Sequence, residues 1–147
     1  MAVELAAKRR YFVGGNWKTS GNKERVETFC RLADDLTVKP SQGDVVVAPP
    51  MIYAGMMADR LKNAKIDVGA QDVSKFGQGP YTGQTSAEML KDIGVEWTII
   101  GHSEHRRIFQ HSDFDIGCKV KNALQHNMNV VLCVGDSHVE RLAGRTN

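Results

Sequence analysis

Residues 97–104 read Trp97-Thr98-Ile99-Ile100-Gly101-His102-Ser103-Glu104, an apolar run that ends at a glycine and is followed at once by a histidine. The run has the length and composition of a buried β-strand. Parallel α/β folds collect their reacting groups at the carboxyl ends of the strands, so a histidine at this position is a candidate catalytic residue. We predict a strand over 97–100 and a helical turn that starts near Ser103.

A second strand end offers a lysine. The short apolar run Tyr11-Phe12-Val13 leads into Gly14-Gly15-Asn16-Trp17-Lys18. Taken alone, Gly-Gly-Asn indicates only a turn, and a loop lysine is usually solvated. Two predicted strand ends nevertheless carry a lysine and a histidine, which makes the carboxyl edge of the sheet the place to look for chemistry.

The rest of the chain alternates short β-rich runs with helical patterns. Strands are predicted over 11–13, 44–48, 65–70, 97–100 and 129–134, and amphipathic helices over 24–36, 51–61, 86–93 and 113–126. This alternation predicts parallel strands joined by right-handed crossovers, with helices covering the sheet. The continuous apolar runs 45–47 and 130–132 are typical of strands buried on both faces.

Periodicity leaves two architectures open. One is an open, doubly wound sheet of five strands, and the other is part of an eight-stranded (β/α)8 TIM barrel, which usually has roughly 250 residues. Strands in an arc of a barrel lie in the order 1-2-3-4-5, whereas the order in a doubly wound sheet reverses at one point. Five strands do not close a barrel, so sheet edges and apolar faces are expected to be bare.

Composition describes an ordinary globular protein. The 147 residues are 41% hydrophobic and 24% charged, with a formal net charge of +2, which fits one domain over 1–147 and gives no reason to expect nucleic-acid or membrane binding. No apolar run approaches the roughly 20 residues of a membrane span. Residues 1–10 are predicted to be a flexible N-terminal extension, although Lys8-Arg9-Arg10 also leaves a targeting segment open.

Three cysteines, Cys30, Cys118 and Cys133, are widely spaced and form no C-x-x-C pair. An odd number of isolated cysteines indicates reduced thiols and a cytoplasmic protein rather than a disulfide framework or a zinc site. Cys133 ends a predicted strand, and with no neighbouring base it is predicted to be a buried structural thiol.

Six short motifs occur in an order and at spacings that resemble the triosephosphate isomerase family, from Tyr11 to the last residue. They are Gly14-Gly15-Asn16-Trp17-Lys18, Gly69-Ala70-Gln71, Tyr81-Thr82-Gly83, Ser86-Ala87-Glu88-Met89-Leu90, Gly101-His102-Ser103-Glu104 and Cys133-Val134-Gly135. The resemblance implies the (β/α)8 barrel, here truncated after the fifth parallel strand. It also implies interconversion of dihydroxyacetone phosphate and D-glyceraldehyde 3-phosphate, a reaction of glycolysis and gluconeogenesis, with no cofactor and no metal ion.

The resemblance also assigns roles to residues. His102 corresponds to the family's catalytic histidine, a neutral imidazole, and Lys18 to its catalytic and substrate-binding lysine; Asn16 lines the same pocket. Proton transfer between adjacent carbons passes through an enediolate, which needs donors aimed at its oxygens. Glu104 corresponds to the acidic residue that orients the lysine, and Cys133 to a cysteine that supports the catalytic base by packing.

A homodimer is the assembly that the resemblance implies. The glycine-rich loop 77–83 taken alone is equally well a mobile surface loop. In the family it is an arm that enters a second subunit and places Thr82 beside the partner's active site, and Tyr81, Trp17 and Gln71 belong to the same contact.

Departures from the family pattern cluster at that contact. Gln84 stands where the family has Glu, His105 where it has Arg, and Gln110-His111 where it has Gly-Glu. Loss of one of these charged residues would leave the remaining charges unpaired at the interface, whereas joint replacement of all of them avoids that energetic cost. We predict a network rebuilt in neutral form. Asp136, where the family usually has Glu, has no clear consequence.

The family's catalytic Glu, lid and phosphate-binding loop all follow the fifth strand, and nothing in this sequence matches them. The chain is therefore expected to have little isomerase activity alone. Three interpretations stay open: part of a triosephosphate isomerase, a half-barrel that serves as a non-catalytic binding or assembly module, and an unrelated doubly wound domain with a ligand at its switch point.

Overall fold

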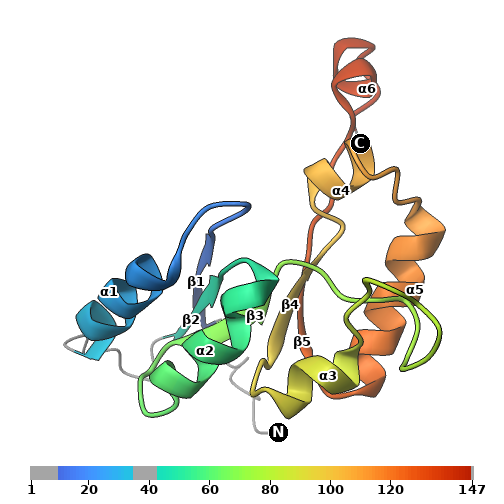
Figure 1. Cartoon of the computed structure of the whole chain (residues 1–147). Helices are drawn as coiled ribbons and strands as arrows, with labels where there is room; N and C mark the ends of the chain where they lie inside the picture. Colours follow the sequence, from blue (N-terminus) through green and yellow to red (C-terminus); the bar gives the residue numbers. More distant parts are fainter. Residues whose placement is uncertain (1–9, 35–42, 147) are drawn as a thin grey trace, which may run out of the picture.

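Five parallel strands form one curled half-barrel in the computed structural model, which describes residues 10–34 and 43–146 (Figure 1). The strands are β1 (Tyr11–Asn16), β2 (Gly43–Ala48), β3 (Asp67–Ala70), β4 (Trp97–Ile100) and β5 (Asn129–Leu132). Their order in space is β1-β2-β3-β4-β5, with every neighbouring pair parallel. This order confirms the arc of a barrel and excludes a doubly wound sheet, in which the strand order reverses at one point.

Within the described residues, six helices lie in the connections between successive strands or follow β5. They are α1 (Lys23–Asp34), α2 (Met51–Leu61), α3 (Ala87–Asp92), α4 (Ser103–Arg107), α5 (Asp113–Gln125) and α6 (His138–Leu142). Figure 1 shows α1 and α2 beside the β1–β3 half of the sheet, α3 and α5 beside the other half, and α6 standing away from the body. In the described part of the chain, every helix is too short or too polar to span a membrane. The predicted helix residues 35–36 and extension residues 1–9 lie outside the described residues.

The core lies between the sheet and these helices. In α1, the side chains of Val26, Cys30 and Ala33 recur at helical spacing and are buried. The same helical spacing would also place Leu32 on this face of α1 and Leu124 on the apolar face of α5, but Leu32 is 62% exposed and Leu124 56% exposed. Periodicity identifies a helix face, but the width of that face depends on which elements pack against it.

Strand β5 differs from its prediction. Val46 and Val47 of β2 are buried, as expected of an inner strand, but Leu132 is 47% exposed and β5 ends there rather than at residue 134. The physical reason is position, because β5 pairs only with β4 in the described sheet. A continuous apolar run predicts burial only when neighbouring elements cover both faces.

Both edges of the sheet carry exposed apolar side chains, as expected. On β1, Tyr11 is 73% exposed and Val13 is 60% exposed, and beyond β5, Val134 is 81% exposed. Among the described strands, β1 pairs only with β2. The half-barrel therefore presents two unpaired strand edges.

Two serine caps provide a matched test of which helices stabilise the fold. Ser112 and Ser137 begin α5 and α6 with the same capping box, closed by Asp115 and Glu140. Buried side chains, including Ile116, anchor α5, whereas α6 has none. Ser112→Ala is expected to lower the free energy of unfolding by about 1 kcal/mol. Ser137→Ala should change it by less than about 0.5 kcal/mol, and urea unfolding giving equal losses would contradict this account.

Candidate active site

The curl of the half-barrel brings the loop after β1 to the start of α4. Lys18 Nζ donates to Glu104 Oε1 at 2.9 Å, although the two residues are 86 positions apart. The lysine side chain is 55% exposed and that of Glu104 37%, so the pair lies at the open carboxyl end of the sheet. The two predicted strand ends therefore do meet at one place.

The Lys18 backbone adopts a conformation that non-glycine residues rarely take, with φ at 53°. Such a conformation costs about 1–3 kcal/mol and persists only where the surroundings enforce it. Here the Lys18 N–H donates to Asn16 Oδ1 at 2.9 Å, and the Lys18 carbonyl accepts from Gln71 Nε2 at 2.9 Å. Strain enforced from both sides is typical of functional positions, which supports the candidate role of Lys18.

Gln71 and Trp17 make contacts inside the chain. The Gln71 amide also donates to the Ala48 carbonyl at 3.0 Å, so it ties the ends of β2 and β3 to Lys18. The Trp17 ring packs edge-on against Phe29 at 5.6 Å between centroids. Sequence reasoning assigned both residues to a dimer contact and missed the positioning of Lys18 by Gln71. The sequence contains no local signal for it, because the two residues are far apart in the chain.

His102 precedes the first turn of α4 and acts as its N-cap. Its Nδ1 accepts the Glu104 backbone N–H at 3.2 Å. An Nδ1 that accepts a hydrogen bond carries no proton, so a neutral ring holds its proton on Nε2. The half-buried imidazole, 23% exposed, can therefore donate from Nε2 to a ligand.

Glu104 is held in its ionised form. The hydrogen bond from Lys18 is the main cause that lowers the pKa of Glu104, and the charges of Lys18 and His102 act in the same direction. A carboxylate with a lowered pKa is a weak proton acceptor. The geometry places Glu104 against the Lys18 ammonium, and the lowered pKa makes its carboxylate a poor base.

Arg106 fixes the strand ends that lie beneath His102. Its Nε donates to the Gly101 carbonyl at 2.8 Å and its Nη2 to the Cys133 carbonyl at 3.1 Å. Gly101 has φ at 76°, and a Cβ there would approach the Cys133 oxygen to 3.1 Å, so glycine is required. Cys133 is half-buried rather than fully buried, because β5 is an edge strand, and this partial burial raises the pKa of its thiol.

The loop between β3 and α3 is attached to α5 at its base. Lys75 Nζ contacts Asp115 Oδ1 at 2.5 Å, and Asn122 Nδ2 donates to the Ser74 carbonyl at 3.0 Å. Beyond this point Tyr81, which stacks on Phe76, is exposed, and so are Thr82 and Gln84. The outer half of the loop is thus presented to its surroundings.

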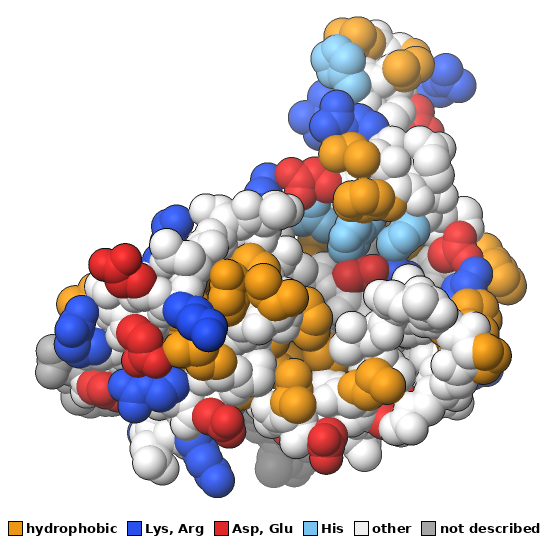
Figure 2. All heavy atoms as spheres, viewed as in Figure 1, with side chains coloured by type: hydrophobic (Ala, Val, Ile, Leu, Met, Phe, Trp, Pro, Cys, Tyr) orange, Lys and Arg blue, Asp and Glu red, His pale blue; other side chains and the backbone are white. Residues whose placement is uncertain are grey.

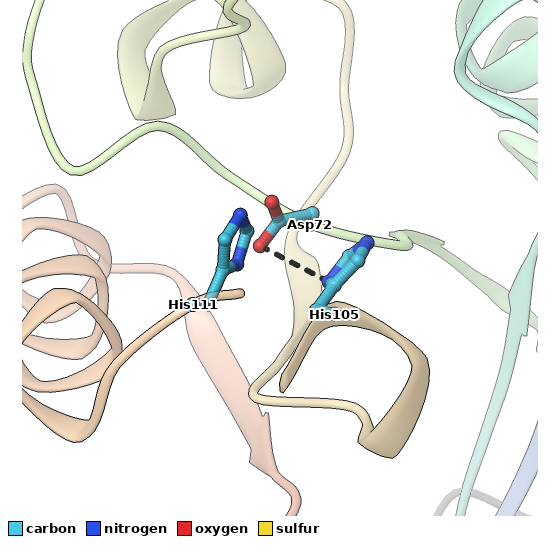
Figure 3. Close-up of side chains that lie close together, drawn as sticks. All are labelled: Asp72, His105 and His111. Carbon is cyan, nitrogen blue, oxygen red and sulfur yellow. Dashed lines mark ion pairs between the residues drawn. The ribbon is translucent and has the colours of Figure 1, made fainter. Parts of the chain in front are cut away.

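Four polar side chains, one of them from α4 itself, lie close together: Asp72, His105, His111 and Lys119. Figure 2 shows pale-blue histidines gathered around a red carboxylate at this place, and Figure 3 shows three of the side chains from close up. Lys119 Nζ contacts Asp72 Oδ2 at 2.5 Å. The neutral replacement at Gln84, His105 and His111 stays a prediction, and both histidines lie beside an ion pair that sequence spacing did not reveal.

Comparison with known proteins gives consistent matches. The family model described as triosephosphate isomerase matches residues 11–147. A triosephosphate isomerase of Taenia solium is 42% identical over 95% of this chain and 55% of its own length. A chloroplastic triosephosphate isomerase of Secale cereale is 42% identical over 98% of this chain and 48% of its own length. The chain thus spans about half the length of the curated relatives it matches.

Proposed function

Since this chain belongs to the triosephosphate isomerase family, we propose that its strand ends carry the electrophilic half of an aldose–ketose isomerase site. The proposed reaction interconverts dihydroxyacetone phosphate and D-glyceraldehyde 3-phosphate. The observation that supports it most is the joint geometry of Lys18, Glu104 and His102, in which a strained lysine and an imidazole whose Nδ1 accepts the Glu104 N–H flank one carboxylate.

The two side chains have separate tasks in this proposal. Moving a proton between adjacent carbons develops negative charge on both substrate oxygens. The Nε2–H of His102 donates to these oxygens, and the Lys18 ammonium stabilises the growing charge and attracts the phosphate dianion. Asn16, whose side-chain oxygen is used by the Lys18 N–H, offers its NH2 group as a further donor.

The base that removes the proton from carbon is a separate requirement. Glu104 is bound to Lys18 and has a lowered pKa, so it does not suit this task. We place the base in the part of the relatives that this chain does not span. The chain alone is then expected to isomerise triose phosphates at least about 10²- to 10⁴-fold more slowly than a protein in which the base is present.

A chimera tests the proposal. In this half-barrel chimera, residues 1–147 are joined to the part of the Taenia solium relative that they do not cover. A coupled assay with D-glyceraldehyde 3-phosphate should show activity in the chimera and almost none in the chain alone. Full activity of the chain alone would contradict the placement of the base. A folded but inactive chimera would instead favour a non-catalytic binding or assembly module.

Assembly and location complete the proposal. The exposed Tyr81–Gln84 segment supports a role as an arm that reaches a second subunit in a homodimer. Sedimentation of the chimera should give a dimer that Thr82→Asp weakens, and a monomer at micromolar concentration would contradict it.

A cytoplasmic location, with a role in glycolysis and gluconeogenesis, is expected in cell fractionation. Recovery in a plastid, the compartment in the Secale cereale relative's name, would contradict that location.

A further inference from the structure

Three side chains from separate parts of the chain converge beside α4. Asp72 follows β3, His105 lies in α4, and His111 lies in the segment between α4 and α5 (Figure 3). Each offers one ligand atom, and these atoms all lie within 4.8 Å of one another. All three residues are half-buried. Two imidazoles and a carboxylate within this distance are a ligand set that divalent transition metals use.

Two of the converging atoms have unmet bonding needs. Asp72 Oδ1 and His105 Nδ1 are buried, and neither has a hydrogen-bond partner within the described residues. They lie 3.8 Å apart, too far for a hydrogen bond with each other. Two ligands of one tetrahedral zinc ion, each at roughly 2.1 Å from it, lie about 3.4 Å apart. A shift of a few tenths of an ångström would let one cation satisfy both atoms.

Lys119 contacts two members of the cluster but does not contact the second carboxylate oxygen of Asp72. The lysine side chain is only 5% exposed, and its Nζ contacts Asp72 Oδ2 at 2.5 Å and His111 Nδ1 at 3.3 Å. The ammonium therefore occupies one carboxylate oxygen and leaves Oδ1 facing His105. Its positive charge weakens the binding of a cation nearby, but the contact leaves the second carboxylate oxygen of Asp72 open to a metal.

The imidazole of His105 is suited to coordination. Its Nδ1 is buried and has no hydrogen-bond partner within the described residues, so no protein group competes for this nitrogen. A neutral imidazole is the form that binds a metal. Its ring also lies 5.1 Å from that of His111, centroid to centroid, and Figure 3 shows the two rings on either side of the Asp72 carboxylate.

We propose that Asp72, His105 and His111 bind one divalent transition-metal cation of the zinc class, through one carboxylate oxygen and two ring nitrogens, with water completing the coordination. The metal would join the end of β3, α4 and the segment before α5. Since His102 is the N-cap of α4, metal binding would also fix the helix that follows this histidine. The inference does not depend on the proposed isomerase reaction.

Metal titration of the purified full chain tests the site. After removal of metals with a chelator, Co²⁺ is added and its d–d absorption is followed, and Zn²⁺ is then used to displace it. One equivalent should bind, without the thiolate-to-cobalt charge-transfer band that cysteine ligation would give. His105→Gln and His111→Gln should each weaken binding by at least about tenfold, and Zn²⁺ should raise the Tm of the unmodified chain.

Two further variants separate lost ligands from lost structure. His138→Gln removes an exposed histidine on α6 and should leave the metal affinity unchanged. His111→Glu keeps a ligand at this position and gives Lys119 an additional anion, so it should bind metal within about tenfold of the unmodified chain. The proposal is overturned if no equivalent of metal binds, if a thiolate band appears, or if His105→Gln and His111→Gln bind as tightly as His138→Gln.

Discussion

In the half-barrel chimera, His102→Gln is expected to lower kcat for D-glyceraldehyde 3-phosphate by about 10²- to 10³-fold. Glutamine can still donate one hydrogen bond, but it cannot exchange a proton with the enediolate as an imidazole can. Lys18→Ala should cause a loss of about the same size, with a raised KM as well, because it removes the cation facing the phosphate dianion. Steady-state kinetics of both variants measure these effects.

Surface residues of the same chemical types serve as controls. His138 and Lys121 are exposed on α6 and α5, away from Lys18 and Glu104. His138→Gln and Lys121→Ala should keep kcat within about twofold. If His102→Gln and Lys18→Ala retain the activity of these controls, the assignment of the electrophilic half is wrong, even where the chimera itself is active.

Asp72→Asn, measured with a chelator present, is expected to lower the free energy of unfolding by about 3–5 kcal/mol. The substitution removes the carboxylate from Lys119, whose side chain is 5% exposed, and leaves a buried ammonium without its anion. Asp72→Asn/Lys119→Met removes both charges and should recover most of the loss. Urea unfolding followed by circular dichroism measures each variant.

An exposed ion pair provides the comparison. Arg60 Nε and Glu27 Oε2 are 3.3 Å apart, and both side chains are 49% exposed. Glu27→Gln should cost less than about 1 kcal/mol, because water screens and solvates both groups. Equal losses in Asp72→Asn and Glu27→Gln would show that Lys119 does not depend on Asp72, and an unrecovered double variant would place the effect elsewhere.

Much of the fold was predictable because strand and helix periods are local. The runs 97–100 and 44–48 became β4 and part of β2, and the helix predicted over 86–93 contains α3, which Ser86 caps. Strand β1 continues to Asn16, past the predicted end at residue 13, because parallel pairing with β2 uses backbone groups that Gly14 and Gly15 also have. Helix α6 was missed, although Ser137 and Glu140 form a readable capping box.

The candidate site, like the fold, was predictable only in part. The family resemblance implied that Lys18, Glu104 and His102 belong to one site, and in the structure Lys18 Nζ lies 2.9 Å from Glu104 Oε1 and the Glu104 nitrogen 3.2 Å from His102 Nδ1. It did not predict that Asp72 and Lys119 would meet, because 47 positions separate them and neither belongs to a motif. Contacts between side chains on different strands and helices depend on the curvature of the sheet, which no local pattern encodes.

The two unpaired edges of the half-barrel also restrict how copies of the chain can associate through the sheet. Strands β1 and β5 point in the same direction but differ in sequence, so pairing the β5 edge of one copy with the β1 edge of the next would extend the parallel order. Such a contact is heterologous, since each partner uses a different surface. Repetition of it gives either a closed ring or an open filament, depending on whether the rotation between copies returns to its starting point.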